Sequence, residues 1–155
     1  MSRLHLIRHA HAGDRRTWTS ADSLRPLSDK GWVQARGLVP LYAGVSWDRI
    51  VSSPSLRCVQ TVQPLAEAHE LRVEEDVRLL EGHDPEDTIA WLERELASRS
   101  LAVCTHGDLV PALLDLAAER GATLPQEVRW PKASTWVLDA DAGRWGNATF
   151  VPPPE

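Results

Sequence analysis

The chain has 155 residues, of which 43% are hydrophobic and 25% charged, a composition typical of one globular domain and not of a disordered chain. No apolar run approaches the roughly 20 residues of a membrane-spanning helix, and no charged leader with a cleavage site follows Met1. The net charge of −5, without a cluster of Lys and Arg, argues against a nucleic-acid polymer as partner. We therefore expect a soluble, cytoplasmic protein.

The N-terminal part of the sequence predicts a strand, a loop and a helix. Arg3–Ile7 has the pattern of a short strand. Residues 14–26 are polar without a sustained period, so we expect them to form a surface loop. Ser28 is a suitable N-cap, and the apolar spacing that follows predicts a helix over 29–41, which Pro40 distorts or ends.

A second strand is also followed directly by a helix. Arg49–Ser52 predicts the strand, and residues 53–55 open a helix that continues to about Glu70 with an interruption near Pro64. Residues 72–77 then form a weak strand or an extended segment.

The remaining elements are predicted by caps, an apolar run and turn residues. In chain order they are a loop over 80–83, a helix begun by Asp84 and Pro85, a buried strand over Leu101–Cys104, a helix from Asp108 to Gly121, and a terminal hairpin of 134–138 and 145–151. We expect one domain over residues 1–151 and a disordered tail over 152–155.

The alternation of strands and helices predicts an α/β fold with a mostly parallel sheet, helices on both faces and a C-terminal hairpin. In such sheets ligands bind beyond the carboxyl ends of the strands. His9 and His106 both follow a predicted strand directly, although 96 residues separate them. We therefore expect the two histidines to share a site.

Residues near these strand ends could perform phosphoryl transfer through a histidine. That reaction needs a neutral imidazole, cations around the phosphoryl oxygens and an acid for the leaving group. Arg8 and Arg57 have planar guanidinium groups that match phosphate oxygens, and His106 could donate a further hydrogen bond.

Four motifs in order resemble the histidine phosphatase superfamily, also called the phosphoglycerate-mutase-like family, over nearly the whole chain. They are the Arg-His pair within Leu6–Ala10, the helix entry Arg25–Gly31 with Gln34 and Ala35, the arginine motif Ser52–Arg57 with Gln60 and Thr61, and the second histidine motif Thr105–Gly107. The resemblance implies the corresponding fold and a metal-independent phosphatase without a cofactor.

The resemblance also implies roles for individual residues. His9 would be the nucleophile that carries the phosphoryl group, and Arg8, Arg57 and His106 would bind phosphate, with His106 also part of the catalytic set. Glu81 would be the proton donor. Glu81 lies in an acidic loop, however, so His83 and Asp84 remain alternatives for that role.

Ala10 stands where most relatives have glycine, a variant found in the short SixA-type phosphohistidine phosphatases. A phosphohistidine protein is therefore the expected substrate. A small phosphoester such as a sugar phosphate or nucleotide is the alternative, because Trp130–Trp136 resembles histidine phosphatase domains attached to Nudix hydrolases. A non-catalytic phosphate-binding module is a third hypothesis, and the sequence predicts no oligomeric state.

Other candidate side chains have simpler interpretations. Cys58 and Cys104 lack the spacing of a zinc site, and we expect them to be reduced packing residues. His9 and His11 do not have the spacing of a helical metal-ligand pair, so we expect no metal. His11 and Arg25 could line a pocket rim or lie in water, and neither is included in the predicted site.

Overall fold

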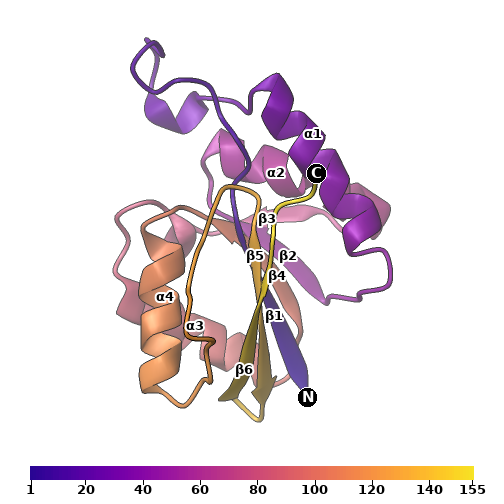
Figure 1. The fold of residues 1–155 in the computed structure, drawn as a ribbon, viewed down its shortest axis with the longest axis vertical. Helices are drawn as coiled ribbons and strands as arrows, with labels where there is room; N and C mark the ends of the chain where they lie inside the picture. The colour runs from indigo at the N-terminus through magenta and orange to yellow at the C-terminus, as the bar shows by residue number, and fades with distance from the viewer.

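The computed structural model describes residues 1–155, which form a six-stranded sheet between two pairs of helices (Figure 1). The elements in chain order are β1 (Ser2–Arg8), η1 (Asp22–Leu24), α1 (Asp29–Leu41), β2 (Arg49–Ser52), α2 (Leu56–Ala68), β3 (Val73–Glu75), η2 (Val77–Leu79), α3 (Pro85–Leu96), β4 (Leu101–Thr105), α4 (Leu109–Glu119), β5 (Thr135–Asp141) and β6 (Arg144–Val151). The predicted α/β class is therefore confirmed. None of the helices has both the length and the apolar character needed to cross a bilayer.

The sheet has the strand order β3-β2-β4-β1-β5-β6. The pairs β2–β3, β2–β4 and β1–β4 are parallel, whereas β5 and β6 form the predicted antiparallel hairpin against β1. Ala142 and Gly143, at the hairpin turn, both have positive φ, as the tight turns that match strand twist require. Because β1 and β4 are adjacent and parallel, their carboxyl ends lie side by side.

Each face of the sheet has its own apolar core. Leu4 and Leu6 of β1 point into a core shared with α3 and α4, whereas Ile7 points into a core shared with α1 and α2. Cys58 and Cys104 are buried in this second core, as packing residues should be. The alternation of side chains along a strand thus places helices on both faces, as predicted.

Helix α1 matches its predicted bounds, and Ser28 caps it by accepting a hydrogen bond from the backbone N–H of Gly31. The interruption predicted near Pro64 was wrong, because α2 continues through that residue to Ala68. Val62 and Leu65 on either side of Pro64 are fully buried. Their packing outweighs the one backbone hydrogen bond that proline removes.

The C-terminal residues 152–155 have no regular secondary structure. Pro154 nevertheless lies against α1, because a Cβ added at Gly37 would come within 2.8 Å of the Pro154 Cβ. The end of the chain therefore lies beside the helix pair α1 and α2 (Figure 1).

Candidate active site

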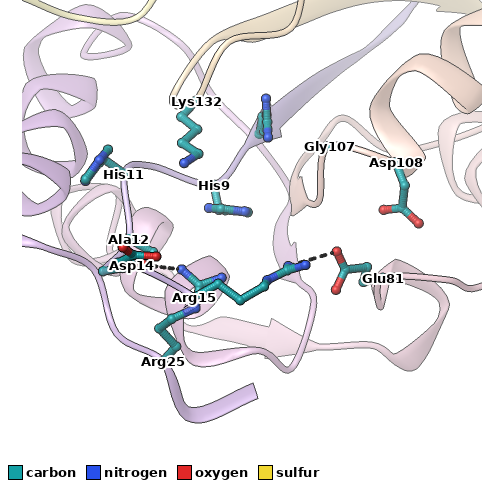
Figure 2. A pocket seen from close by; sticks show the side chains of 12 residues that line it. His9, His11, Ala12, Asp14, Arg15, Arg25, Glu81, Gly107, Asp108 and Lys132 are labelled. Carbon is teal, nitrogen blue, oxygen red and sulfur yellow. Dashed lines mark hydrogen bonds and ion pairs between the residues drawn. The ribbon is translucent and has the colours of Figure 1, made fainter. Parts of the chain in front are cut away.

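A cavity of about 600 Å³ opens beyond the carboxyl ends of β1 and β4 (Figure 2). The residues that line it are mostly polar: Arg8, His9, His11, Ala12, Gly13, Asp14, Arg15, Arg25, Glu81, Gly107, Asp108 and Lys132. The predicted residues Arg8, His9 and Glu81 are thus in the wall of one cavity. His11 and Arg25, which the prediction left out, are there as well.

His9 is held immediately after β1. Its backbone N–H donates to the carbonyl oxygen of Thr105 at 3.1 Å, which ties it to the end of β4. Its Nδ1 lies 2.8 Å from the carbonyl oxygen of Ala10. Because a carbonyl oxygen can only accept, Nδ1 carries the proton, and the lone pair is on Nε2.

The environment of His9 favours its neutral form. Burial lowers the pKa of His9 most, and the hydrogen bond to Ala10 opposes this effect. The charges of Arg57, His106 and Arg8 lower the pKa further, so that it falls to about 3. The residue is only 6% exposed. At neutral pH this imidazole is therefore unprotonated at Nε2 and able to act as a nucleophile.

Arg8 forms one wall of the cavity at the end of β1. Its Nη1 donates to the carbonyl oxygen of Trp130 at 2.9 Å, and its buried Nε has no protein partner. The guanidinium passes directly over Gly107, where a Cβ would come within 2.7 Å of Nη2. Glycine after His106 therefore gives Arg8 the space it occupies.

Arg57 projects from the first turn of α2 and is only 1% exposed. Its Nη1 donates to the carbonyl oxygen of Asp22 at 2.9 Å, and its Nη2 lies 3.1 Å from an Asp22 carboxylate oxygen. The same Nη2 is 3.8 Å from the carboxylate of Glu81. Carboxylate oxygens thus surround the guanidinium that the sequence predicts to bind phosphate.

His106 lies behind the cavity wall and is also 1% exposed. Its Nε2 is 2.8 Å from Ser53 Oγ, and its Nδ1 is 3.4 Å from Nη2 of Arg57. The His106 and His9 rings have centroids 5.6 Å apart. The structure therefore gathers the predicted residues Arg8, His9, Arg57 and His106, with Ser53 as an orienting partner that sequence analysis had not singled out.

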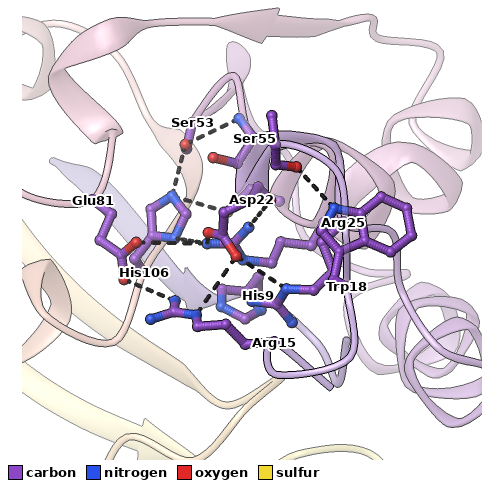
Figure 3. A network of polar contacts seen from close by, with 12 residues as sticks. His9, Arg15, Trp18, Asp22, Arg25, Ser53, Ser55, Glu81 and His106 are labelled. Carbon is purple, nitrogen blue, oxygen red and sulfur yellow. Dashed lines mark hydrogen bonds and ion pairs between the residues drawn. The ribbon is translucent and has the colours of Figure 1, made fainter. Parts of the chain in front are cut away.

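Asp22 is the centre of an ion-pair network that sequence analysis missed (Figure 3). Its carboxylate contacts Arg15, Arg25 and Arg57, and the Arg25 side chain is nearly buried. Partial burial alone would raise the pKa of Asp22. The hydrogen bond from Arg25 and the charges of the nearby arginines outweigh this effect and hold the pKa below its usual value. Residues 14–26 do not simply lie in water, because η1 packs against Arg57.

The Glu81 side chain is 47% exposed at the mouth of the cavity, where it pairs with Arg15 at 3.3 Å. Its loop is held by Asp108, whose carboxylate accepts a hydrogen bond from the backbone N–H of Gly82 at 2.8 Å. The two alternative acids are engaged elsewhere, since Asp84 caps α3 and His83 pairs with Asp87. Of these three, only Glu81 lines the cavity.

No group of three His, Cys, Asp or Glu side chains is arranged to hold a metal ion. The site instead combines a neutral imidazole with guanidinium groups and the carboxylates of Asp22 and Glu81 beside them. Such a combination can bind a phosphoryl dianion and accept it on nitrogen.

Comparisons with known proteins agree with this chemistry. Residues 4–83 match the model of the histidine phosphatase superfamily (branch 1). The chain is also 30% identical, over 97% of its length, to an 8-oxo-(d)GTP phosphatase from Mycolicibacterium smegmatis. It spans about half of that relative, because the alignment covers 48% of the longer protein.

Solved structures give the same result for the fold. The protein histidine phosphatase SixA complexed with tungstate superposes with a TM-score of 0.77 at 25% identity, covering 99% of this chain and 96% of that chain. SixA from Agrobacterium tumefaciens gives 0.79 at 23% identity, covering 98% and 99%. A mycobacterial glucosyl-3-phosphoglycerate phosphatase gives 0.73 at 20% identity, covering 97% of each chain.

Proposed function

The chain belongs to the histidine phosphatase superfamily, and from that premise we propose that it hydrolyses a phosphorylated substrate through a covalent phosphohistidine on His9. The observation that carries the proposal is the state of the His9 ring. Its Nδ1–H is tied to Ala10, its pKa is lowered to about 3, and its Nε2 is left with a lone pair beside Arg8.

In the first step, His9 Nε2 attacks phosphorus, and the bond to the leaving group breaks as the N–P bond forms. Glu81 donates a proton to the departing atom. In the second step, water attacks the phosphohistidine while the same carboxylate takes up its proton, and inorganic phosphate leaves. His9 returns to its neutral form, and every proton and electron pair is accounted for without a metal or cofactor.

Arg8 and Arg57 would stabilise the negative charge on the phosphoryl oxygens, because a bidentate guanidinium matches their geometry. Burial strengthens these interactions, since few water molecules compete for the buried Arg57. His106, oriented by Ser53, would contribute next to Arg57. The Nε groups of both arginines are buried and have no protein partner.

Two substrate classes have support. A phosphohistidine protein is supported by the likeness to SixA, which is described as a protein histidine phosphatase. A small phosphoester is supported by the identity to an 8-oxo-(d)GTP phosphatase. The segments from Arg57 to Glu81 and from Glu81 to His106 contain only strands and helices of the central fold. No inserted domain therefore blocks the access of either substrate class to the cavity.

Covalent labelling tests the nucleophile directly. Brief incubation with a radiolabelled phosphohistidine peptide or phosphoramidate, followed by denaturation in alkali, should leave label that acid then releases. His9→Ala should retain no label and no turnover, although its circular dichroism should be unchanged. Equal labelling of the variant would contradict the role of His9.

The chain offers a control on β1, the strand that ends directly before His9. His5 is also buried with a pKa lowered to about 4, by burial and then by the charge of Arg3, but its Nδ1 accepts a hydrogen bond from Trp47 in the core. His5→Asn should therefore keep the label while losing stability. Activity of the parent enzyme should also persist in a chelator.

A further inference from the structure

Lys132 lies on a segment that is held tightly against the nucleophile. The backbone N–H of Ala133 donates to the carbonyl oxygens of Arg8 and His9, at 3.1 and 3.2 Å. Arg8 in turn donates through its side chain to Trp130 and through its backbone to Ser134. The segment from Trp130 to Ser134 is thus fixed on both sides of Lys132 to the end of β1.

The same segment contains a backbone conformation that non-glycine residues rarely adopt. Ala133 has φ of 66°, in the left-handed region, which strains the backbone of a residue with a side chain. Its side chain is buried, and the strain is maintained by the hydrogen bonds to Arg8 and His9. The result is that Lys132 lines the cavity and points toward His9 (Figure 2).

Lys132 differs from the other cations at the cavity mouth. Arg15 pairs with Asp22 and Glu81, and Arg25 pairs with Asp22, whereas Lys132 has neither a hydrogen bond nor an ion pair with any protein group. Burial and then the charges of four nearby arginines, Arg8, Arg25, Arg15 and Arg57, lower the pKa of Lys132. The ammonium group therefore lies in a positive field without a counter-charge.

We propose that Lys132 binds a second anionic group of the substrate, next to the transferred phosphoryl group, so that the substrate is a small molecule with two neighbouring phosphates. This rests on the proposed function. Arg8, Arg57 and His106 already complement one phosphoryl dianion, and Lys132 adds a cation that this dianion does not require. A phosphohistidine side chain carries one phosphoryl group only.

The position of the subsite follows from the distribution of charge around the cavity. Figure 2 shows Lys132 and His11 on one side of His9, and the carboxylates of Glu81 and Asp108 on the other. Asp14 also lies on the side of Lys132, but its carboxylate is paired with Arg16. A second phosphate would be repelled by the two carboxylates and attracted by Lys132. His11 stands next to this position with its Nδ1 engaged by Ser28 Oγ at 2.6 Å, which leaves Nε2 for a ligand.

Equilibrium binding tests the subsite without requiring turnover. Calorimetry should show that the enzyme binds methylenediphosphonate at least about tenfold more tightly than methylphosphonate, since the former alone has a second anionic group. Lys132→Met and Lys132→Gln should lose most of this preference. Lys30 is the only other lysine, lies on the exposed start of α1 and does not line the cavity, so Lys30→Met should keep it.

The inference is overturned if the parent enzyme shows no preference, if the Lys132 variants keep it, or if they weaken both ligands by the same factor. Thermal unfolding of each variant shows that it is folded. Hydrolysis of ADP and of p-nitrophenyl phosphate separates this inference from the proposed function. Without hydrolysis of any phosphorylated compound the proposed function fails, whereas hydrolysis of p-nitrophenyl phosphate together with failure to bind methylenediphosphonate preferentially overturns the subsite alone.

Discussion

The floor and the rim of the cavity are built in different ways. We call Arg8, His9, Arg57 and His106 the floor: Arg8 and His9 line the cavity, and Arg57 and His106 are buried behind its wall. Strand ends and a helix start fix all four. The rim comes from loops and the 3-10 helix η1. It consists of His11, Arg15, Arg25, Glu81 and Lys132, which line the cavity, and of Asp22, which pairs with Arg15 and Arg25. We propose that the floor groups serve phosphoryl transfer to histidine in general, whereas the rim groups decide which leaving group the site accepts.

Glu81 gives the largest expected effect, and it tests whether a rim residue can act on the reacting atoms. Glu81→Gln keeps the size and polarity of the side chain but cannot donate a proton, and general acid catalysis contributes roughly 10²- to 10⁴-fold. Turnover of an alkyl phosphate should fall by that order. Turnover of p-nitrophenyl phosphate should fall much less, because its leaving group needs little protonation.

Steady-state kinetics with both esters measures this difference. If both substrates slow by the same factor, Glu81 is only a positioning residue, through its contact with Arg15 or its 3.8 Å approach to Arg57. His83→Gln and Asp84→Asn are matched controls in the same loop region. Neither residue lines the cavity, so neither variant should change the ratio of the two rates.

Arg57→Lys tests the floor with a change that keeps the charge. An ammonium group cannot reproduce two parallel hydrogen bonds, and loss of one such contact of ~1.4 kcal/mol corresponds to about tenfold in kcat/KM. Inhibition by vanadate should weaken in parallel. Arg15→Lys makes the same change at the half-exposed rim and should cost roughly threefold or less.

An unchanged vanadate inhibition constant in Arg57→Lys would place Arg57 outside the phosphate site. A large loss in Arg15→Lys would remove the distinction between floor and rim. The comparison of these two variants is therefore more informative than either variant alone.

The floor could be predicted from sequence because local patterns determine it. The strand patterns of β1 and β4 end directly before His9 and His106, and their register places Arg8 opposite Thr105. Once the two strands are parallel neighbours, both histidines must lie at one edge of the sheet. The short motif that contains Arg57 similarly combines the end of β2 with the start of α2.

The part of the rim within residues 14–26 could not be predicted in the same way, because this segment has no periodic pattern and its position depends on tertiary contacts. The loop is held by the backbone pairing of Ala12 with Leu27. The backbone N–H of His11 donates to the side chain of Gln34 in α1. The hydroxyl group of Ser28, the N-cap of α1, contacts both the carbonyl oxygen and Nδ1 of His11. A side chain at Gly31 would overlap the His11 carbonyl oxygen. A glycine in the first turn of a helix was therefore the one local signal that another segment packs there.

Asp22→Asn gives the smallest expected effect and tests whether the loop competes with the substrate. The Asp22 carboxylate lies on Nη2 of Arg57, where an oxygen of a bound phosphate would also be attracted, and it is partly exposed. Surface ion pairs contribute about 0.2–1 kcal/mol, so neutralisation of Asp22 should tighten inhibition by phosphate by a factor of roughly 1.4 to 5. Because its arginine partners lower the pKa of Asp22, the carboxylate stays ionised at neutral and weakly acidic pH. The difference between parent and variant should therefore be constant from about pH 5 to 8 and should disappear only as the pH falls through that lowered pKa.

Asp14→Asn is the matched control for Asp22→Asn. It removes a carboxylate of the cavity wall that does not contact Arg57, since Asp14 pairs with Arg16, and it should give a smaller change. If Asp22→Asn instead weakens phosphate binding, the carboxylate serves to orient Arg57, and Asp22 belongs functionally to the floor although it lies on a rim loop.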